Sequence, residues 1–164
     1  MIQQNLVKVG MADLNIATDG EILKTTGLGS CVGLALFDPI RKVAGMAHVM
    51  LPSSDIARET NINFAKYADT AIPELLERMI AAGAVVERMR AKMAGGAQMF
   101  AMSGHSDSLR IGPRNVESCI LMLDRFKIPI LGQDTGGSFG RTIEFDSVSG
   151  MLSIRSVQFG TKEI

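Results

Sequence analysis

Frequent turn signals are the feature that most limits the folds open to this chain, because they divide it into short apolar runs. Such signals stand at Asp38-Pro39, at Gly95-Gly96 and at Ser149-Gly150. Only two stretches change to the three- and four-residue spacing of an amphipathic helix, one from Phe64 to Gly83 and one that begins near Pro113. Several strands joined by hairpins, together with two helices, predict an α+β fold rather than strict βαβ alternation.

The apolar runs between these signals have the length and composition of strands. We expect one or two strands within residues 6–17 and further strands at 32–37, 43–51, 88–93, 128–131, 142–145 and 151–157. No linker, repeat or low-complexity segment interrupts the 164 residues, which is a length typical of one domain. We therefore expect a single domain over residues 1–164.

Charge and composition exclude several classes of function. The 17 Lys and Arg residues balance 17 Asp and Glu residues, whereas proteins that bind nucleic acid usually carry a basic face. No run approaches the ~18 apolar residues of a membrane span, and the first residues do not form a secretory signal. We expect a cytoplasmic protein that neither binds nucleic acid nor inserts into membranes, with its two cysteines as free thiols.

The stretch from residue 25 to 32, Thr-Thr-Gly-Leu-Gly-Ser-Cys-Val, is the best candidate for chemistry. Gly27 and Gly29 permit a close approach of the backbone to a ligand. A cysteine directly after such a turn can have free backbone N–H groups beside it, from Gly29, Ser30 and Cys31, as an oxyanion hole requires. The common alternative for any one cysteine is a buried, inert thiol.

His48 is the predicted partner of Cys31. A turn centred near Pro39-Ile40 pairs Phe37 with Lys42, and the same register places Cys31 directly opposite His48 on one face of the hairpin. The imidazole would then lower the pKa of the thiol and populate the nucleophilic thiolate. The alternative for His48 is a buried histidine whose ring is satisfied by a backbone carbonyl.

A third polar group should orient the imidazole, as in other pairs of a nucleophile and a base. Asp13, Thr25, Thr26 and Asp38 are the nearby candidates in the sequence. Physical reasoning from the sequence alone does not choose among these four.

The remaining candidates have simpler interpretations. Cys119 lies on the apolar stripe of the second helix and is expected in the core, and His105 lies in a polar run that predicts a solvated loop. No pair among Cys31, His48 and His105 has the close spacing of metal ligands, so no metal site is expected. Arg114-Asn115, at the start of the second helix, is expected to cap or anchor it rather than to recognise a substrate.

Several motifs in combination resemble the CheD family, the chemoreceptor glutamine deamidases of bacterial and archaeal chemotaxis. The resemblance covers almost the whole chain. Its motifs are Thr25-x-Gly27-Leu28-Gly29-Ser30-Cys31-Val32, Asp38-Pro39, Gly45-Met46-Ala47-His48-x-Met50-Leu51-Pro52, Lys66-Tyr67-Ala68-Asp69, Gly95-Gly96-Ala97, Ile111-Gly112-x-Arg114-Asn115 and Asp134-Thr135-Gly136-Gly137 followed by Gly140-Arg141.

The resemblance implies a three-layer α/β/β sandwich with mixed sheets and a catalytic triad of Cys31, His48 and Thr25. It implies deamidation of receptor glutamines through a cysteine thioester, with no metal or organic cofactor. The implied partners are chemoreceptors and the phosphatase CheC, which links the family to the response regulator CheY. The alternative function is a non-catalytic regulatory protein that binds receptors and CheC.

Overall fold

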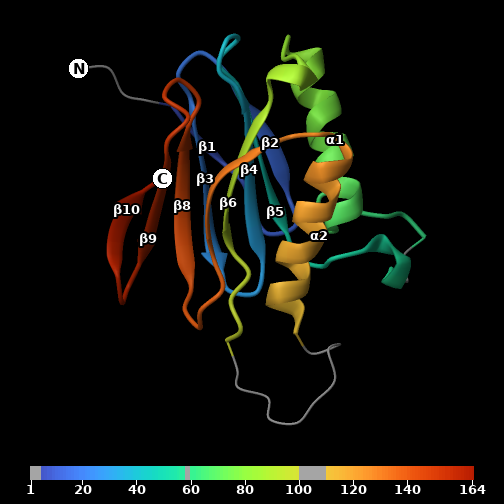
Figure 1. Ribbon diagram of the computed structural model, residues 1–164, viewed down its shortest axis with the longest axis vertical. Coiled ribbons are helices and arrows are strands. Elements are labelled where there is room, and N and C mark those ends of the chain that lie inside the picture. The colour runs from blue at the N-terminus through green and yellow to red at the C-terminus, as the bar shows by residue number, and fades with distance from the viewer. Residues whose placement is uncertain (1–4, 58–59, 100–109) are drawn as a thin grey trace.

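The computed structural model describes residues 5–57, 60–99 and 110–164. Two five-stranded sheets and a layer of two helices lie on top of one another (Figure 1). The first sheet has the order β1 (Leu6–Lys8), β3 (Ile22–Leu28), β8 (Arg141–Asp146), β9 (Leu152–Ser156), β10 (Gly160–Glu163). The second has the order β2 (Leu14–Ala17), β5 (Val43–Val49), β4 (Val32–Asp38), β6 (Arg90–Gly95), β7 (Ile130–Thr135).

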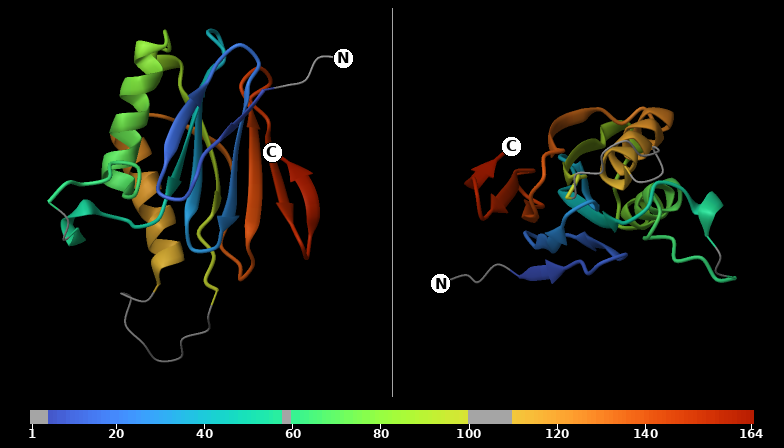
Figure 2. Two further views of the ribbon diagram at one scale, coloured as in Figure 1. Left: turned by 180° about the vertical axis from the view of Figure 1, so that it is seen from behind. Right: turned by 90° about the horizontal axis from the view of Figure 1, so that it is seen from below.

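The helices cover only one face of the second sheet, and the first sheet covers the other face (Figure 2). They are α1 (Ala68–Ala81) and α2 (Ile111–Arg125), with short 3₁₀ turns at Ser54–Ile56 and Val86–Arg88. Each sheet contains one parallel pair, β1 with β3 and β6 with β7, among antiparallel pairs. The predicted α/β/β sandwich with mixed sheets is therefore confirmed.

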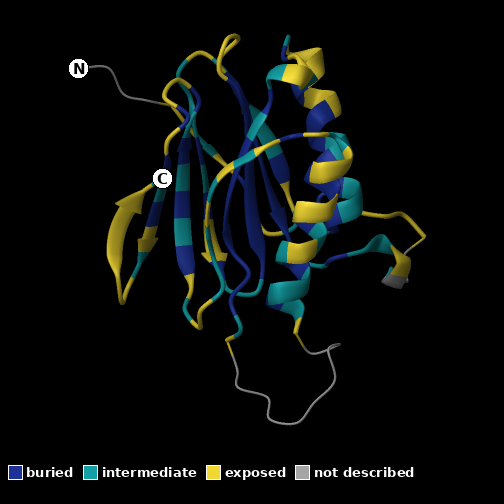
Figure 3. Ribbon diagram, in the orientation of Figure 1, coloured by how far each residue is buried: buried dark blue, intermediate teal, exposed yellow. Residues whose placement is uncertain are grey.

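Two hydrophobic cores result from this layering. Leu34 and Leu36 of β4 pack toward the helices, while Ala35 and Phe37 of the same strand pack toward the first sheet. Successive side chains of a strand point to opposite faces, so a strand between two layers is buried on both. Every residue of β4 and β5 is accordingly buried, which explains why both are apolar apart from Asp38 and His48 (Figure 3).

The two predicted helices are present with shifted bounds. The first begins at Ala68 rather than near Phe64 and continues past Pro73. Cys119 is fully buried in the core between the helices and the second sheet, which confirms its predicted packing role. Within the described residues, neither helix is both long and apolar enough to cross a membrane.

Strand β3 was not among the predicted strands, because Thr25, Thr26 and Gly27 interrupt its apolar pattern. The structure forms the strand with an irregularity, since the pairing register with β8 shifts between Thr25 and Leu28. Gly27 takes φ +71° there, a left-handed conformation that suits glycine. Thr25 lies before this irregularity and is buried on the same face as Leu23, whereas Thr26 is exposed.

The predicted register of the β4–β5 hairpin is wrong by two residues. Gly33, not Cys31, pairs with His48, and Phe37 pairs with Ala44 rather than with Lys42. A shift of two residues keeps every side chain on its predicted face, because side chains alternate with a period of two. Cys31 and His48 therefore share the face that looks toward the first sheet, but as diagonal rather than direct neighbours.

The side chain of Asp38 explains the shifted turn. Its Oδ1 accepts hydrogen bonds from the N–H groups of Ile40 and Arg41, and its carbonyl accepts one from Lys42. An aspartate that binds the backbone of the following residues fixes the turn directly after itself. The turn therefore covers residues 39–42 and lies one residue later than predicted.

Candidate active site

His48 and Thr25 meet between the two sheets. His48 comes from β5 and is fully buried, and Thr25 comes from β3 in the other sheet. The distance from Thr25 Oγ1 to His48 Nδ1 is 2.7 Å. The structure thus selects Thr25 among the four candidates that the sequence left open.

The two aspartates have other partners. Oδ2 of Asp38 forms an ion pair of 2.9 Å with Arg88 and also accepts the N–H of Val85. Asp13 contributes its backbone carbonyl, which accepts the N–H of His48 at 2.9 Å. Its carboxylate binds N–H groups of its own loop. Neither carboxylate takes the position of the imidazole's hydrogen-bond partner.

Cys31 lies at the end of the loop that precedes β4, and its side chain belongs to the core between the sheets. Only 7% of its surface is exposed. Gly33 stands between Cys31 and His48 on the same face and has no side chain to separate them. Diagonal neighbours of this kind have Cα atoms roughly 7–8 Å apart, and no hydrogen bond joins the Cys31 thiol to the imidazole in the structure.

One ring nitrogen of His48 remains available for chemistry. Nδ1 contacts Thr25, whereas Nε2 is buried and has no hydrogen-bond partner within the part of the chain that the structure describes. A buried polar atom without a partner is uncommon and often marks a functional site. The geometry is that of an oriented imidazole with its second nitrogen free.

Burial controls the charge of both groups. It raises the pKa of the Cys31 thiol, and the residue's own backbone N–H offsets this only in part. Burial also lowers the pKa of His48, against a smaller opposing effect of Asp13. Both shifts favour the neutral forms of the thiol and the imidazole, which is opposite to the lowered thiol pKa that the sequence predicts.

Gly29 and Ser30 precede Cys31 in a loop that is held by other segments. The Gly29 carbonyl accepts the N–H of Ala97 at 2.9 Å, and the Cys31 carbonyl accepts the N–H of Gly96 at 2.8 Å. Asn115 donates to the Ser30 carbonyl at 3.0 Å. Sequence reasoning predicted only a general capping or anchoring role for Asn115, because a contact over 85 residues has no local signal.

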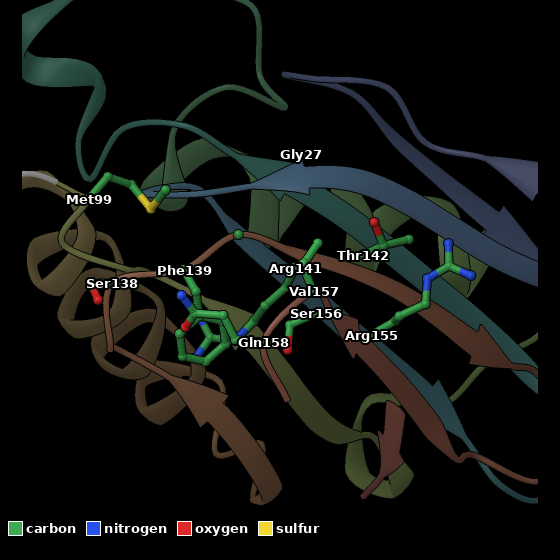
Figure 4. A pocket seen from close by; sticks show the side chains of 11 residues that line it. Gly27, Met99, Ser138, Phe139, Arg141, Thr142, Arg155, Ser156, Val157 and Gln158 are labelled. Carbon is green, nitrogen blue, oxygen red and sulfur yellow. The ribbon is translucent and has the colours of Figure 1, made fainter. Parts of the chain in front are cut away.

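An open pocket of about 670 Å³ lies beside this loop. Figure 4 shows residues that line it, among them Gly27, Met99, Phe139, Arg141 and Arg155. Met99 connects the pocket to the loop, since a Cβ at Gly29 would lie 3.3 Å from Met99 Cγ. Neither Cys31 nor His48 lines it, so the pocket adjoins the candidate site rather than containing it.

Arg141 supports one wall of this pocket from within. It forms a 3.0 Å ion pair with Asp134 and stands over the ring of Phe139, 4.1 Å from the centroid. Burial raises the pKa of Asp134, but the hydrogen bonds and charges of Lys162 and Arg141 outweigh it and hold the pKa below its usual range. These groups satisfy one another, so we assign them a structural role.

His105 lies outside the described residues, and its predicted loop position stays a prediction. Among the residues that the structure describes, no three His, Cys, Asp or Glu side chains group as metal ligands.

Residues 50–156 match the model of one protein family, which is described as CheD chemotactic sensory transduction. A protein of Halalkalibacterium halodurans named chemoreceptor glutamine deamidase CheD is 54% identical over 160 residues, covering 98% of this chain and 99% of that protein. The Bacillus subtilis protein of the same name is 48% identical over 159 residues, covering 97% of this chain and 96% of that protein. These matches place the chain among the proteins of chemotactic sensory transduction. It belongs to the CheD family.

Proposed function

We propose that this protein deamidates glutamine side chains of chemoreceptors to glutamate, with Cys31 as the nucleophile, His48 as the base and Thr25 as the group that orients His48. The observation that carries the proposal is the 2.7 Å contact between Thr25 and His48, which leaves Nε2 of the ring unpartnered on the face that His48 shares with Cys31. The names of the relatives in two bacilli support the substrate and the reaction.

The first step uses the neutral pair. With the Nδ1–H of His48 donating to Thr25 Oγ1, Nε2 carries the lone pair that accepts the thiol proton. Sγ of Cys31 then attacks the carboxamide carbon of the glutamine, forming the C–S bond and a tetrahedral oxyanion. Backbone N–H groups of Ser30 and Cys31 stabilise this oxyanion, whereas that of Gly29 donates to the Gly27 carbonyl at 3.1 Å.

The second step returns the enzyme to its starting state. Protonated His48 gives its proton to the departing nitrogen, so that ammonia leaves and a thioester remains. His48 next accepts a proton from water, and the resulting hydroxide attacks the thioester carbon. The C–S bond breaks, glutamate is released and Cys31 regains its proton. In sum, one water is consumed and one ammonia is formed for each glutamine, with no metal or organic cofactor.

Ammonia release from purified cytoplasmic fragments of chemoreceptors tests this proposal. The wild-type protein should release ammonia, and Cys31→Ala should release none above background. Cys119→Ala is the matched control, because it removes the other cysteine from a core position away from the site. Full activity of Cys31→Ala, or loss of activity in a folded Cys119→Ala, would contradict the assignment.

The same proposal includes CheC as a regulatory partner that binds this protein. The competing function is non-catalytic binding of receptors and CheC. A Cys31→Ala variant that still binds receptor fragments separates the two functions in cells. Loss of the chemotactic response in that variant supports catalysis, and a normal response supports the binding role.

A further inference from the structure

Three successive carbonyl groups of the loop that carries the cysteine are each held by a donor from elsewhere in the chain. The Gly29 carbonyl accepts from Ala97 N–H and the Cys31 carbonyl from Gly96 N–H. The middle carbonyl, that of Ser30, accepts from a side chain, Nδ2 of Asn115, at 3.0 Å. A loop so fixed has little freedom to turn its peptide planes.

The direction of a carbonyl determines the direction of the next N–H. A trans peptide is planar, with its C=O and its N–H pointing to opposite sides. Holding the Ser30 carbonyl against α2 therefore points the N–H of Cys31 away from the helix, and the Gly29 carbonyl directs the N–H of Ser30 in the same manner. Within the described part of the chain no other residue accepts either N–H, and that of Cys31 contacts only its own thiol.

The side chain of Asn115 also reaches the strand of the base. The same Nδ2 donates to the carbonyl of Met50 at 2.9 Å, two residues after His48. Because both neighbours are carbonyl oxygens, only the NH₂ end of the amide can face them, which fixes its orientation. The buried amide of Asn115 thus links the peptide that precedes Cys31 to the backbone two residues after His48.

Helix capping does not account for this side chain. Asn115 is the fifth residue of α2, and the N-cap residue is Arg110. Its Oδ1 is buried without a hydrogen-bond partner among the described residues, so the two carbonyl contacts through Nδ2 are the polar interactions that its amide makes. A residue of the helix interior whose amide donates to the carbonyls of Ser30 and Met50 serves the backbone beside Cys31 and His48.

Asn115 can reach the loop because the backbones of α2, of β6 and of the loop approach one another closely at two glycines. A Cβ at Gly112 would overlap the carbonyl oxygen of Ala97, and a Cβ at Gly95 would overlap that of Cys31. Gly95 also has φ +110°, which side chains rarely permit. The first turn of α2 and the end of β6 therefore pack directly on the backbone around Cys31.

We propose that Asn115 is a positioning residue for the oxyanion site, because it holds the Ser30 carbonyl so that the N–H of Cys31 faces the reacting carboxamide. The proposal rests on the proposed deamidation. Asn115 touches neither substrate nor reacting atoms and acts through the peptide between Ser30 and Cys31.

The test compares two reactions of the same thiol. Deamidation passes through an oxyanion, whereas alkylation of Cys31 by iodoacetamide displaces iodide and needs no oxyanion hole. Asn115→Leu, which lacks the donor, should lower kcat for receptor fragments about 10²-fold with little change in KM. Its rate of Cys31 alkylation, followed by mass spectrometry of the Cys31 peptide, should equal that of the wild type at each pH.

Two further variants complete the design. Cys119 lies on the same helix as Asn115, one turn further along the chain. Cys119→Ala should lower the free energy of unfolding but leave kcat unchanged. If Asn115→Leu does not fold, Asn115→Ser carries the same prediction with a smaller loss, because its shorter side chain retains a donor hydroxyl. Unchanged kcat in a folded Asn115 variant, or a parallel fall of deamidation and alkylation, would overturn the proposal. A wild-type protein that releases no ammonia would instead overturn the proposed deamidation.

Discussion

The hydroxyl of Thr25 and the imidazole of His48 meet across the interface of two different sheets, with 2.7 Å between Oγ1 and Nδ1. Both side chains are buried, so water does not compete for this hydrogen bond. A buried hydrogen bond that fixes one ring nitrogen also determines where the other nitrogen points. The relative position of the two sheets therefore sets the orientation of the proposed base.

Replacing Thr25 by valine should test this orientation with little change in shape. Thr25→Val removes the oxygen, leaves Nδ1 without its partner and should reduce kcat about 10²-fold, the contribution typical of general acid–base catalysis. Thr25→Ser should retain most of the activity. Thr26→Val is the matched control, because Thr26 is exposed. Equal losses in the Thr25→Val and Thr26→Val variants, measured by ammonia release, would contradict the role of Thr25.

The proposed reaction starts from the neutral forms of His48 and Cys31, so the pH dependence of kcat/KM should report the pKa of each group. Burial lowers the pKa of His48, so the acidic limb should lie below the ordinary histidine value of about 6.5. Burial raises the pKa of Cys31, so the alkaline limb should lie above the ordinary cysteine value of about 8.5. We expect a broad plateau across neutral pH. An acidic limb above the ordinary histidine value, or an alkaline limb below the ordinary cysteine value, would contradict this account.

Asp38 should stabilise the fold rather than take part in the chemistry. Burial raises the pKa of Asp38, but hydrogen bonds from Arg88 and from nearby backbone N–H groups bring it to about 2. A lowered pKa stabilises the folded state above the unfolded value of about 3.9, and this contribution is lost as the pH falls toward 2. Asp38→Ala should lower the free energy of unfolding by about 3 kcal/mol at neutral pH.

The exposed ion pair of Arg78 with Glu74 supplies the control for this measurement. Glu74→Ala should change the free energy of unfolding by less than about 1 kcal/mol, because solvent screens exposed pairs. Urea unfolding at neutral and acidic pH measures both variants. An effect of Asp38→Ala no larger than that of Glu74→Ala would contradict the assigned role.

The sequence predicted the parts of this molecule that depend on local patterns. Alternating and continuous apolar runs indicated β4 and β5, and helical spacing indicated α1 and α2. The register of the hairpin was missed by two residues because the side chain of Asp38 displaces the turn. The common face of Cys31 and His48 survived this error, since a shift of two residues preserves the faces.

The contacts that shape the candidate site could not be predicted by physical reasoning from local patterns, because they join distant segments. Thr25 reaches His48 from another sheet, through a strand whose bulge hides its apolar pattern. Asn115 binds the carbonyl of Ser30 from 85 residues away. The neutral state of the thiol and the imidazole follows from burial, which the sequence of a single hairpin does not reveal.

The central claim is that Cys31 converts receptor glutamines to glutamates. Peptide mass spectrometry of chemoreceptor cytoplasmic fragments, incubated in parallel with the wild-type protein and with Cys31→Ala, tests it most directly. The account predicts that particular glutamines gain the mass of an amide-to-carboxyl conversion with the wild type and stay unchanged with Cys31→Ala. The same conversions at the same glutamines with Cys31→Ala, or none with the wild type, would contradict it.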